Sequence, residues 1–424
     1  MSSLLDDLQW RGLIHQLTDP DALPALLERE RTVAYIGFDP TAASLHVGHL
    51  QQILLLRRVQ DAGHVPIALV GGGTGMIGDP GGRTEERNLL DEPTLEHNRQ
   101  GIGTQLASFL DFGPGGAILA DNAEWLATAG LLPFLRDVGK LFTVNEMIRK
   151  DSVRSRIEGR EQGLSFTEFS YMLLQAWDFL QLYDRHGCRL QLGGSDQWGN
   201  ITEGVDLLRR QRGVAAFGLT SPLILKPDGS NFGKSESGTV WLDPARTSPY
   251  AFFQFWLRTA DADVGGYLRR LTLLGREEVE GLDQAVADHP ERREAQRALA
   301  RAVTTMVHGA AETERAERAA AVLFTEDLVT LDVDTLAQIL DDAPVTPVRP
   351  QDLGGTLTVV GALTDTGLAP SRGAARRDIA QGAVYLNNRK VADDRPLTPD
   401  DAIHGRFVIL RRGKANQHVL AVGG

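Results

Sequence analysis

One stretch of the sequence decides the fold: YIGFDPTAASLHVGHL, at residues 35–50. The apolar run at 33–38 predicts a buried strand, which the Asp-Pro-Thr sequence at 39–41 ends. Helical apolar spacing over about 48–63 is followed by a second apolar run at 65–70. We therefore expect a βαβ unit, which implies a parallel sheet with a right-handed crossover.

Two imidazoles lie at the start of the expected helix, with a glycine between them. Ser44 is a candidate N-cap, and His46 and His49 are one turn apart. Gly48 removes a side chain where a large group must approach the backbone. Free N–H groups and the positive end of the helix dipole suit a phosphate, so the simplest interpretation is a nucleoside-triphosphate site. A zinc site on the two histidines is an alternative, but it lacks a third ligand at a suitable spacing.

The composition limits the class of protein. A chain of 424 residues predicts roughly two to four domains, and 42% hydrophobic with 24% charged residues is ordinary for a soluble globular protein. The net charge of -12 argues against a generally basic nucleic-acid binder, although it is compatible with a local basic surface. The single cysteine, Cys188, excludes a disulfide framework and a cysteine cluster for zinc. The N-terminus lacks the order of a signal peptide and no apolar run is long enough for a bilayer, so we expect a cytoplasmic protein.

A glycine-rich segment, GGGTGMIGDP at 71–80, follows the second strand. Three of its glycines fit the G-x-G-x-x-G pattern of dinucleotide-binding proteins, so a dehydrogenase is one hypothesis. That pattern should open a helix, whereas Pro-Gly-Gly at 80–82 would break one. We favour a glycine-rich floor on which a ligand lies, with the Asp79 carboxylate facing the site.

Residues 166–183 predict a helix with one polar stripe. Tyr171, Gln175 and Asp178 fall at i, i+4 and i+7 and therefore share a face. A polar stripe on an apolar helix needs partners, either an internal hydrogen-bond network or a small polar ligand held by a phenol, an amide and a carboxylate. The next strand leads into GGSDQWGN at 193–200, a position where open α/β sheets bind ligands.

Other segments carry weaker signals. We expect a helix over 1–30, a charged mobile loop over 84–100, and strands at 117–120, 189–192 and 223–225. The glycine- and serine-rich stretch after the last strand, KPDGSNFGKSESG at 226–238, predicts a flexible loop. A lysine in such a loop can swing onto a polyphosphate.

The C-terminal part differs in composition. Residues 248–342 are rich in Ala, Leu, Glu and Arg and predict a helical domain, which a proline-rich linker follows. Residues 355–424 contain ten Lys and Arg against six Asp and no Glu, a net charge of +4, whereas the rest of the chain carries -16. This asymmetry makes the tail the expected docking place for an RNA backbone, although a basic domain without that role is the alternative.

Within the tail, arginines gather on an expected helix at 371–377, and VYLNNRKV at 384–391 predicts a hairpin with a tight Asn-Asn turn. Five basic residues are candidate RNA contacts: Arg372, Arg376, Arg377, Arg389 and Lys390.

Together these motifs resemble the bacterial-type tyrosyl-tRNA synthetases, which are class I aminoacyl-tRNA synthetases. His46-Val47-Gly48-His49 is similar to the HIGH-type signature of that class, and Phe232-Gly233-Lys234-Ser235 resembles its second, KMSKS-type loop. The tyrosyl branch is matched by residues 35–41, Gly78-Asp79-Pro80, the polar stripe and residues 193–200. The tail resembles the RNA-binding module shared with small-ribosomal-subunit protein four. The resemblance covers nearly the whole chain in the family's order.

The resemblance implies an α/β fold in four parts. These are a Rossmann-type parallel-sheet catalytic domain at 1–246, an α-helical anticodon-recognition domain at 247–342, a linker at 343–354 and a small α+β RNA-binding domain at 355–424. The catalytic domain would include a mobile signature loop, which consists of Asn231, Phe232, Gly233, Lys234 and Ser235.

The resemblance also implies roles for individual residues. Substrate tyrosine would be held at its amino group by Tyr171, Gln175 and Asp79, at its phenolic hydroxyl by Tyr35 and Asp178, and at its carboxylate end by Gln197. The ATP site would be lined by Gly37, Asp39, Thr41, His46, Gly48, His49, Gly193, Asp196 and Lys234. The leaving pyrophosphate would meet Lys234 and Arg83, which stands where the family usually has a lysine. The catalytic set would be His46, His49, Thr41, Lys234 and Arg83.

The implied reaction is activation of L-tyrosine with ATP to tyrosyl-adenylate and pyrophosphate, followed by transfer to the terminal ribose of tRNA(Tyr). Mg²⁺ would accompany ATP, and no zinc or organic cofactor is expected. The family implies a homodimer, and no membrane partner is expected. One departure is Asn231, where the second signature usually begins with lysine. The alternatives are a tryptophanyl-type synthetase, against which Tyr35 and Asp178 argue, and a non-catalytic RNA-binding paralogue.

Overall fold

A computed structural model describes most of the chain: residues 3–78, 90–150, 153–154, 157, 164–224, 232, 234–235, 238–322, 326–340, 343–413 and 416–423. The chain divides into two compact units. The first comprises residues 1–247 and 259–302, and the second residues 248–258 and 303–424. This division differs from the boundary expected at residue 246, because the first helix after that boundary belongs to the second unit and the next two belong to the first.

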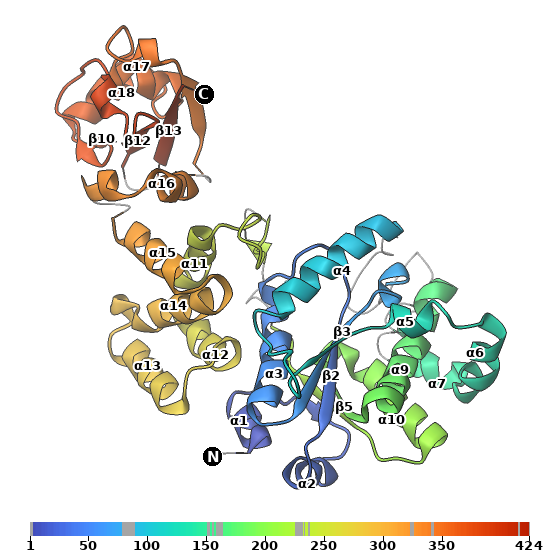
Figure 1. Ribbon diagram of the computed structural model, residues 1–424. Coiled ribbons are helices and arrows are strands. Elements are labelled where there is room, and N and C mark those ends of the chain that lie inside the picture. The colour runs from blue at the N-terminus through green and yellow to red at the C-terminus, as the bar shows by residue number, and fades with distance from the viewer. Residues whose placement is uncertain are drawn as a thin grey trace. The chain divides into compact units, whose positions relative to one another are not determined.

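A six-stranded sheet forms the centre of the first unit (Figure 1). Its order is β1-β6-β5-β2-β3-β4, and all neighbours are parallel except β1 and β6. The strands are β1 Gln16–Leu17, β2 Val33–Phe38, β3 Val65–Val70, β4 Ile118–Asp121, β5 Cys188–Gly194 and β6 Phe217–Ser221. The expected α/β fold with a parallel sheet is confirmed.

The strand order reverses next to β2. Along the chain, β3 and β4 are added on one side of β2, whereas β5 and β6 lie on the other. In open α/β sheets the crevice at such a reversal, outside the carboxyl ends of the strands, is where ligands bind. The fold therefore places the ends of β2 and β5 at the point where a site is expected.

Helices cover both faces of this sheet (Figure 1). α3 (Leu50–Asp61) connects β2 to β3 on one face, and α9 (Phe166–His186) and α10 (Trp198–Arg212) lie on the other. The other helices that begin in this unit are α1 Leu4–Trp10, α2 Ala22–Arg29, α4 Glu92–Leu106, α5 Ala123–Leu126, α6 Leu131–Asp137, α7 Val144–Arg149, α12 Asp261–Leu271, α13 Arg276–Asp288 and α14 Glu294–His308. None of the described helices is both long and apolar enough to cross a membrane.

The predicted helix at 166–183 is confirmed and extends to His186 as α9. It begins at a capping box, in which the Ser165 hydroxyl accepts from the Glu168 N–H at 3.2 Å and the Glu168 carboxylate accepts from the Ser165 N–H. It ends at Gly187, whose φ of 67° is the left-handed conformation that glycine adopts freely. Phe179 packs in the same core as Tyr35 of β2, which fixes the helix against the sheet.

The first signature helix starts differently from our expectation. His46, not Ser44, caps it: the His46 Nδ1 accepts from the Gly48 N–H at 3.1 Å, and a 3₁₀ turn, Val47–His49, precedes α3. The Ser44 hydroxyl is buried and donates to the Leu45 carbonyl oxygen at 2.7 Å. The serine is thus used inside the preceding loop and is not available to the helix.

Three other local expectations are wrong. Residues 1–30 are not one helix, because β1 separates α1 from α2 and Gly12, at φ 68°, turns the chain. Residues 92–100 belong to α4, which begins at an Asp91 cap that accepts from the Thr94 N–H, whereas residues 84–89 lie outside the described part. The strand expected at 223–225 lies earlier, as β6, and Pro222 follows it and cannot donate to the sheet.

The second unit contains helices and a five-stranded sheet. The helices are α11 Pro249–Leu257, α15 Ala310–Val322, α16 Val333–Leu340, α17 Val359–Asp365 and α18 Arg372–Ala380. The sheet has the order β11-β10-β12-β13-β9, with β9 Val345–Val348, β10 Val384–Leu386, β11 Arg389–Lys390, β12 Phe407–Arg412 and β13 Asn416–Val422. The predicted hairpin is present, since β10 pairs with β11 across Asn387 and Asn388, whose φ angles of 47° and 62° fit a tight primed turn.

The segment expected to be a linker, 343–354, takes part in this sheet. Its residues 345–348 form β9, which pairs in parallel with β13, and Val348 and Leu353 are buried in the core of the C-terminal sheet. Its prolines suggested a linker, but a parallel edge strand tolerates proline, and Pro347 lies on that edge.

Substitution of Gly101 in α4 tests how this helix is held. A Cβ at Gly101 would clash with the backbone carbonyl oxygen of Ala43. A Cβ at Gly103 would meet only the end of the Leu119 side chain, at 3.4 Å. We expect Gly101→Ala to lower the free energy of unfolding by about 2 kcal/mol or more. Gly103→Ala, the matched control, should be neutral or raise it by about 0.5–1 kcal/mol, as alanine does in a helix interior. Urea denaturation measures both, and equal effects of the two substitutions would contradict this packing.

Candidate active site

The predicted site residues meet where the strand order reverses. Asp39 follows β2 directly, and the 3₁₀ turn Ser195–Gln197 follows β5. α9 supplies Tyr171, Gln175 and Asp178 from the side that faces the sheet. Three segments that are far apart in the sequence therefore meet at the place where open α/β sheets form a ligand crevice, and we refer to this place as the crevice.

At the inner end of the crevice lies the phenol of Tyr35, on the central strand β2. Its hydroxyl is buried and has no hydrogen-bond partner among the described residues. Burial, and then the negative charge of Asp178, raise the pKa of this phenol, so it remains protonated. A buried hydroxyl without a partner costs free energy that a bound polar group can recover.

Asp178 is a buried carboxylate with two donors. Its oxygens accept from the Trp125 indole N–H at 2.7 Å and from the Asn122 amide at 3.0 Å, and only 2% of the residue is exposed. Burial raises the pKa of Asp178 to about 7, although these two hydrogen bonds lower it. The carboxylate is thus ionised at mildly alkaline pH and is held in one orientation.

Asn122 connects this carboxylate to Asp39, at the end of β2. Its carbonyl oxygen accepts from the Gly73 N–H at 2.7 Å, and its amide also donates to the Thr74 hydroxyl at 3.0 Å. The Thr74 hydroxyl donates to the Asp39 carboxylate at 3.1 Å. A continuous chain of buried or half-buried hydrogen bonds therefore runs from Asp178 to Asp39.

The rest of the polar stripe is also paired. The Tyr171 hydroxyl donates to Asp39 at 3.3 Å. The Gln175 amide donates to the Gln197 carbonyl oxygen at 3.1 Å, and Asn200 donates to Gln175 at 2.9 Å. The amide and phenol groups thus form a network that fixes their orientation beside the crevice.

The two histidines lie against each other, with their rings tilted by 52°, just before α3. Their ring centroids are 4.1 Å apart, and the His49 Nδ1 accepts from the His46 N–H at 3.2 Å. Burial, and then the neighbouring His46, lower the pKa of His49 to about 3. His49 is therefore neutral at pH 7, and because its Nδ1 accepts, its proton lies on Nε2.

The second signature loop is anchored beside the first. The Val47 N–H donates to the Val240 carbonyl oxygen at 3.0 Å, and the Leu242 N–H donates to the Leu45 carbonyl oxygen at 2.9 Å. His46 lies opposite Trp241 in this pairing. The backbone of Lys234–Ser235 forms β7, which pairs with β8, Gly238–Thr239. The two signatures, almost 190 positions apart, are neighbours in space.

The glycines in the site differ in what a side chain at their position would meet. We expected Gly48 to leave room for a ligand, but a Cβ there would lie 2.7 Å from the His46 ring and 3.4 Å from the Phe232 carbonyl oxygen, so the space is used by the protein itself. Gly37, exposed near the end of β2, faces open space. A Cβ at Gly193 would press on the Gln197 side chain at 3.2 Å.

Some predicted residues are not tested by this geometry. Asp79, Arg83, Asn231 and Gly233 lie outside the described residues, and only the backbone of Lys234 and Ser235 is described. Thr41 and Asp196 are exposed next to the crevice. The candidate RNA contacts in the second unit, Arg372, Arg376, Arg377, Arg389 and Lys390, are all exposed.

Sequence reasoning missed the residues that orient the site. Asn122, Thr74 and Trp125 are each at most 4% exposed and contribute the donors described above. A buried polar Asn directly after a short apolar strand was the one available signal, since such a side chain must find partners.

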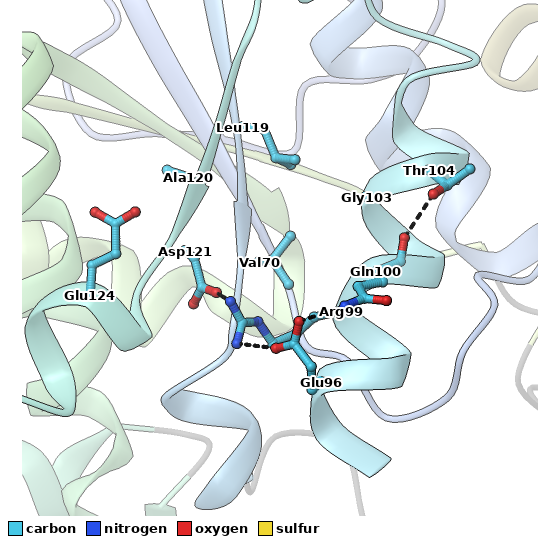
Figure 2. Close-up of a pocket in the computed structure, with 10 residues that line it drawn as sticks. All are labelled: Val70, Glu96, Arg99, Gln100, Gly103, Thr104, Leu119, Ala120, Asp121 and Glu124. Atoms are coloured by element: carbon cyan, nitrogen blue, oxygen red, sulfur yellow. Dashed lines mark hydrogen bonds and ion pairs between the residues drawn. The ribbon is translucent and has the colours of Figure 1, made fainter. Parts of the chain in front are cut away.

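A separate cavity of about 630 Å³ lies between α4 and β4 (Figure 2). Arg99 spans it and pairs with Glu96, at 2.7 Å, and with Asp121. Asp121 faces this cavity, whereas the next residue, Asn122, faces the crevice, as neighbours at a strand end point to opposite sides. None of the predicted site residues lines the cavity, so we do not assign the chemistry to it.

Comparisons with known proteins agree with the geometry. A family model for class I tRNA synthetases of the W and Y type matches residues 27–325, and a model of the C-terminal domain of tyrosine–tRNA ligases matches residues 335–420. The tyrosine–tRNA ligase of Roseiflexus castenholzii is 54% identical over 424 residues, which cover 99% of each chain. The chain belongs to the tyrosine–tRNA ligase family. Both the resemblance seen in the motifs and the class I synthetase fold are thereby confirmed.

Solved tyrosyl- and tryptophanyl-tRNA synthetases both share the fold of this chain. A truncated mitochondrial tyrosyl-tRNA synthetase of Aspergillus nidulans matches with a TM-score of 0.69 and 32% identity, over 76% of this chain and 95% of that chain. A tryptophanyl-tRNA synthetase of Encephalitozoon cuniculi matches with a TM-score of 0.55 at 15% identity, over 79% of this chain and 90% of that chain, which shows a shared fold alone. The tyrosine–tRNA ligase family is favoured over the two alternatives, a tryptophanyl-type enzyme and a non-catalytic paralogue.

The raised pKa of Asp178 predicts a pH-dependent contribution to stability. Between its usual pKa of 3.8 and about 7, the folded protein keeps a proton that the unfolded chain has released. This group therefore makes the free energy of unfolding fall as pH rises through that window, by up to about 1.4 kcal/mol per pH unit. Asp178→Asn removes the titration, so the stability of the variant relative to the parent should increase from pH 4 to 7 and stay level above it.

Urea denaturation of the parent and Asp178→Asn at several pH values measures this difference. The opposite contribution of neutral His49 is present in both proteins and cancels. A stability difference independent of pH would show that Asp178 titrates normally.

Proposed function

We propose that this chain activates L-tyrosine with ATP and transfers the tyrosyl group to the 3′-terminal ribose of tRNA(Tyr). The observation that carries the proposal is the Tyr35 hydroxyl, which is buried and has no partner in the part of the chain that the structure describes, beside the buried carboxylate of Asp178. A substrate phenol can donate to Asp178 and accept from Tyr35, which satisfies both groups at once. An amino acid without the hydroxyl would leave the buried Tyr35 hydroxyl unpaired and would give Asp178 no donor beyond Trp125 and Asn122.

The opposite end of the substrate would meet the polar network. We assign Tyr171, Gln175 and Asp79 to the amino group, and Gln197 to the carboxylate end. Tyr171 and Gln175 are already oriented by Asp39 and Asn200, which supports the assignment because groups with fixed orientation lose little entropy on binding. Asp79 remains an assignment from the family motif alone.

ATP would lie on the glycine-lined end of β2 and β5. Gly37 faces open space and allows a planar or phosphate group to approach the strand. Asp39, Gly48, Gly193, Asp196 and Thr41 would surround the nucleotide. The helix start at His46 and His49, with a neutral His49 whose Nε2 carries a proton, offers donors to phosphate oxygens.

The chemistry requires alignment more than a protein nucleophile. The carboxylate of tyrosine attacks the α-phosphorus of ATP, the bond to the β-phosphate oxygen breaks, and pyrophosphate leaves. No side chain needs to act as a base, because the substrate carboxylate is itself the nucleophile. His46, His49 and Thr41 on the rigid side, and Lys234 and Arg83 on the other, would stabilise charge that moves onto the leaving pyrophosphate. A ribose hydroxyl of tRNA then attacks the adenylate, and AMP leaves.

Mg²⁺ would accompany the phosphates of ATP. Among the described residues, no group of three or more His, Cys, Asp or Glu could hold a metal ion. Because this finding covers only the described residues, the absence of zinc stays a prediction.

The second unit supplies the proposed RNA contacts. On α18 Ala374, Ala375 and Ile379 are buried, whereas the three arginines Arg372, Arg376 and Arg377 are exposed. Arg389 and Lys390 are exposed on the edge strand β11. This arrangement, with a net charge of +4 for residues 355–424, supports docking of a phosphate backbone. The anticodon-recognition role of the helices at 247–342, and a cytoplasmic location, are further parts of the proposal.

A homodimer is supported by an apolar face on the first unit. α6, α7 and α9 share one small core, yet Leu132 and Phe166 are about three-quarters exposed, at 76% and 77%. The other members of this apolar face are Leu131, Leu135, Val144 and Ile148. Exposed apolar side chains gathered on helices that share a core support an association surface, and a second copy of the chain is the proposed occupant.

Light scattering or sedimentation tests the dimer. We expect the parent to be dimeric at micromolar concentration and Leu132→Glu to be monomeric, because a charge buried at an interface without a partner is costly. Val329→Glu, at a 55% exposed position of the second unit that is not part of this face, should leave the dimer intact. A monomeric parent would contradict the proposal.

Substitution of Tyr35 tests the tyrosine site directly. Tyr35→Phe removes the unpartnered hydroxyl, so without ligand the free energy of unfolding should rise by about 1 kcal/mol. With ligand, the substrate loses one hydrogen bond, so its dissociation constant should increase on the order of tenfold or more. Calorimetry measures both effects. Tyr183→Phe, on the exposed end of α9, should change neither, and undiminished tyrosine binding by Tyr35→Phe would refute the assignment.

Transfer is tested separately, with labelled tyrosine and bulk tRNA. Formation of tyrosyl-tRNA supports the complete function, whereas adenylate formation without transfer limits it to activation.

A further inference from the structure

Tyr267, on α12, contacts the second signature loop, although it belongs to neither signature. Its ring lies against that of Phe232, with ring centroids 5.0 Å apart and an angle of 54° between the planes. Phe232 is 7% exposed, so its ring is part of the packed interior. Such tilted aromatic pairs contribute more than their buried area alone.

Phe232 in turn lies against the first signature. A Cβ at Gly48 would be 3.4 Å from the Phe232 carbonyl oxygen, and Gly48 is itself packed by the His46 ring. The loop residue next to Tyr267 is therefore also next to the proposed phosphate-binding histidine. A change in the position of Phe232 would alter the spacing between the two signatures.

α12 is a rigid base for this contact because buried arginines hold its C-terminal end. Arg58 of α3 donates to the Thr272 carbonyl oxygen at 2.6 Å, and Arg11 donates to the Arg269 and Leu274 carbonyl oxygens at 2.9 and 3.0 Å. Guanidinium groups at a helix C-terminus pair the free carbonyls and complement the dipole. Asp7 accepts from Arg11 and lies 3.7 Å from Arg58, so the buried charges are partly compensated.

The contacts form a closed circuit. α3 follows the turn that contains Gly48, and its Arg58 holds the end of α12. Tyr267 of α12 packs on Phe232, and the Phe232 carbonyl oxygen lies next to Gly48. The downstream end of the loop is held independently, by the pairing of residues 240–242 with 45–47. Tyr267 is thus the side chain through which α12 holds the upstream end.

We propose that Tyr267 is a positioning residue for the adenylate-forming step, which sets the distance between the two signatures through its contact with Phe232. The inference rests on the proposed function. Tyr267 touches no substrate, so its loss should lower the rate of activation and leave the affinity for tyrosine unchanged. The aromatic ring carries this role, and the hydroxyl does not.

Tyrosine-dependent exchange of pyrophosphate into ATP by the full-length chain tests the rate. We expect Tyr267→Ala to lower kcat on the order of tenfold, since misplacement of a charge-stabilising group by a fraction of an ångström has effects of that size. The KM for tyrosine should stay within about twofold of the parent. Tyr267→Phe keeps the ring and should restore the parental kcat. Tyr183→Ala removes another partly buried aromatic of the same unit, in the last turn of α9, and should have no effect.

A double-mutant cycle and deuterium exchange make the test specific. Phe232→Ala and Tyr267→Ala should not be additive in kcat, because both remove one contact. Backbone amides of residues 232–242 should exchange faster in Tyr267→Ala but not in Tyr267→Phe. If Tyr267→Ala does not fold, Tyr267→Leu, which keeps apolar volume without the ring, replaces it in every arm.

Two results would overturn the inference: a Tyr267→Ala kcat equal to that of Tyr183→Ala, or a loss of tyrosine affinity that matches the loss of rate. The failure of the proposed function looks different, because the parent itself would then show no tyrosine-dependent exchange. The deuterium-exchange comparison would still decide whether Tyr267 positions the loop.

Discussion

The buried carboxylate of Asp178 is the constraint on which the site depends. It lies in an apolar core, where a charge is expensive, and is held there by the Trp125 indole and the Asn122 amide. Beside it the Tyr35 hydroxyl has no partner among the described residues. The protein thus carries an unfavourable arrangement in the absence of ligand. A substrate hydroxyl that donates to Asp178 and accepts from Tyr35 would pair the buried Tyr35 hydroxyl. The free energy recovered in this way would favour substrates that carry such a hydroxyl.

The parallel sheet makes this arrangement possible. β2 brings Tyr35 and Asp39 to one edge, β4 brings Asn122 to the same edge, and β5 leads to Gln197. α9 crosses beside them and contributes Asp178, Gln175 and Tyr171. Because one hydrogen-bonded chain connects Asp178 to Asp39 through Asn122 and Thr74, the amino-acid end and the nucleotide end share one rigid frame. Chemistry that relies on alignment benefits from such a frame.

Local patterns predicted the fold and half of the site. The apolar run at 33–38, the helical spacing behind it and the polar stripe of α9 are properties of short segments, and each appears in the structure. Asn122, Thr74 and Trp125 could not be found in this way, because their roles depend on which strands become neighbours. The same holds for the cap of α3: the sequence favours Ser44, but Ser44 is held by Gln105 of α4 and His46 accepts from the Gly48 N–H instead. The prediction of a linker at 343–354 was wrong for a related reason, because residues 345–348 form a strand by pairing with the distant β13.

The central claim is that the crevice recognises a phenolic amino acid and activates it. Pyrophosphate exchange into ATP by the parent chain, with tyrosine, phenylalanine or tryptophan as the only amino acid, tests it most directly. The account predicts rapid exchange with tyrosine and rates near background with the other two, because only tyrosine satisfies both Tyr35 and Asp178. Comparable exchange with phenylalanine, or faster exchange with tryptophan, would contradict it.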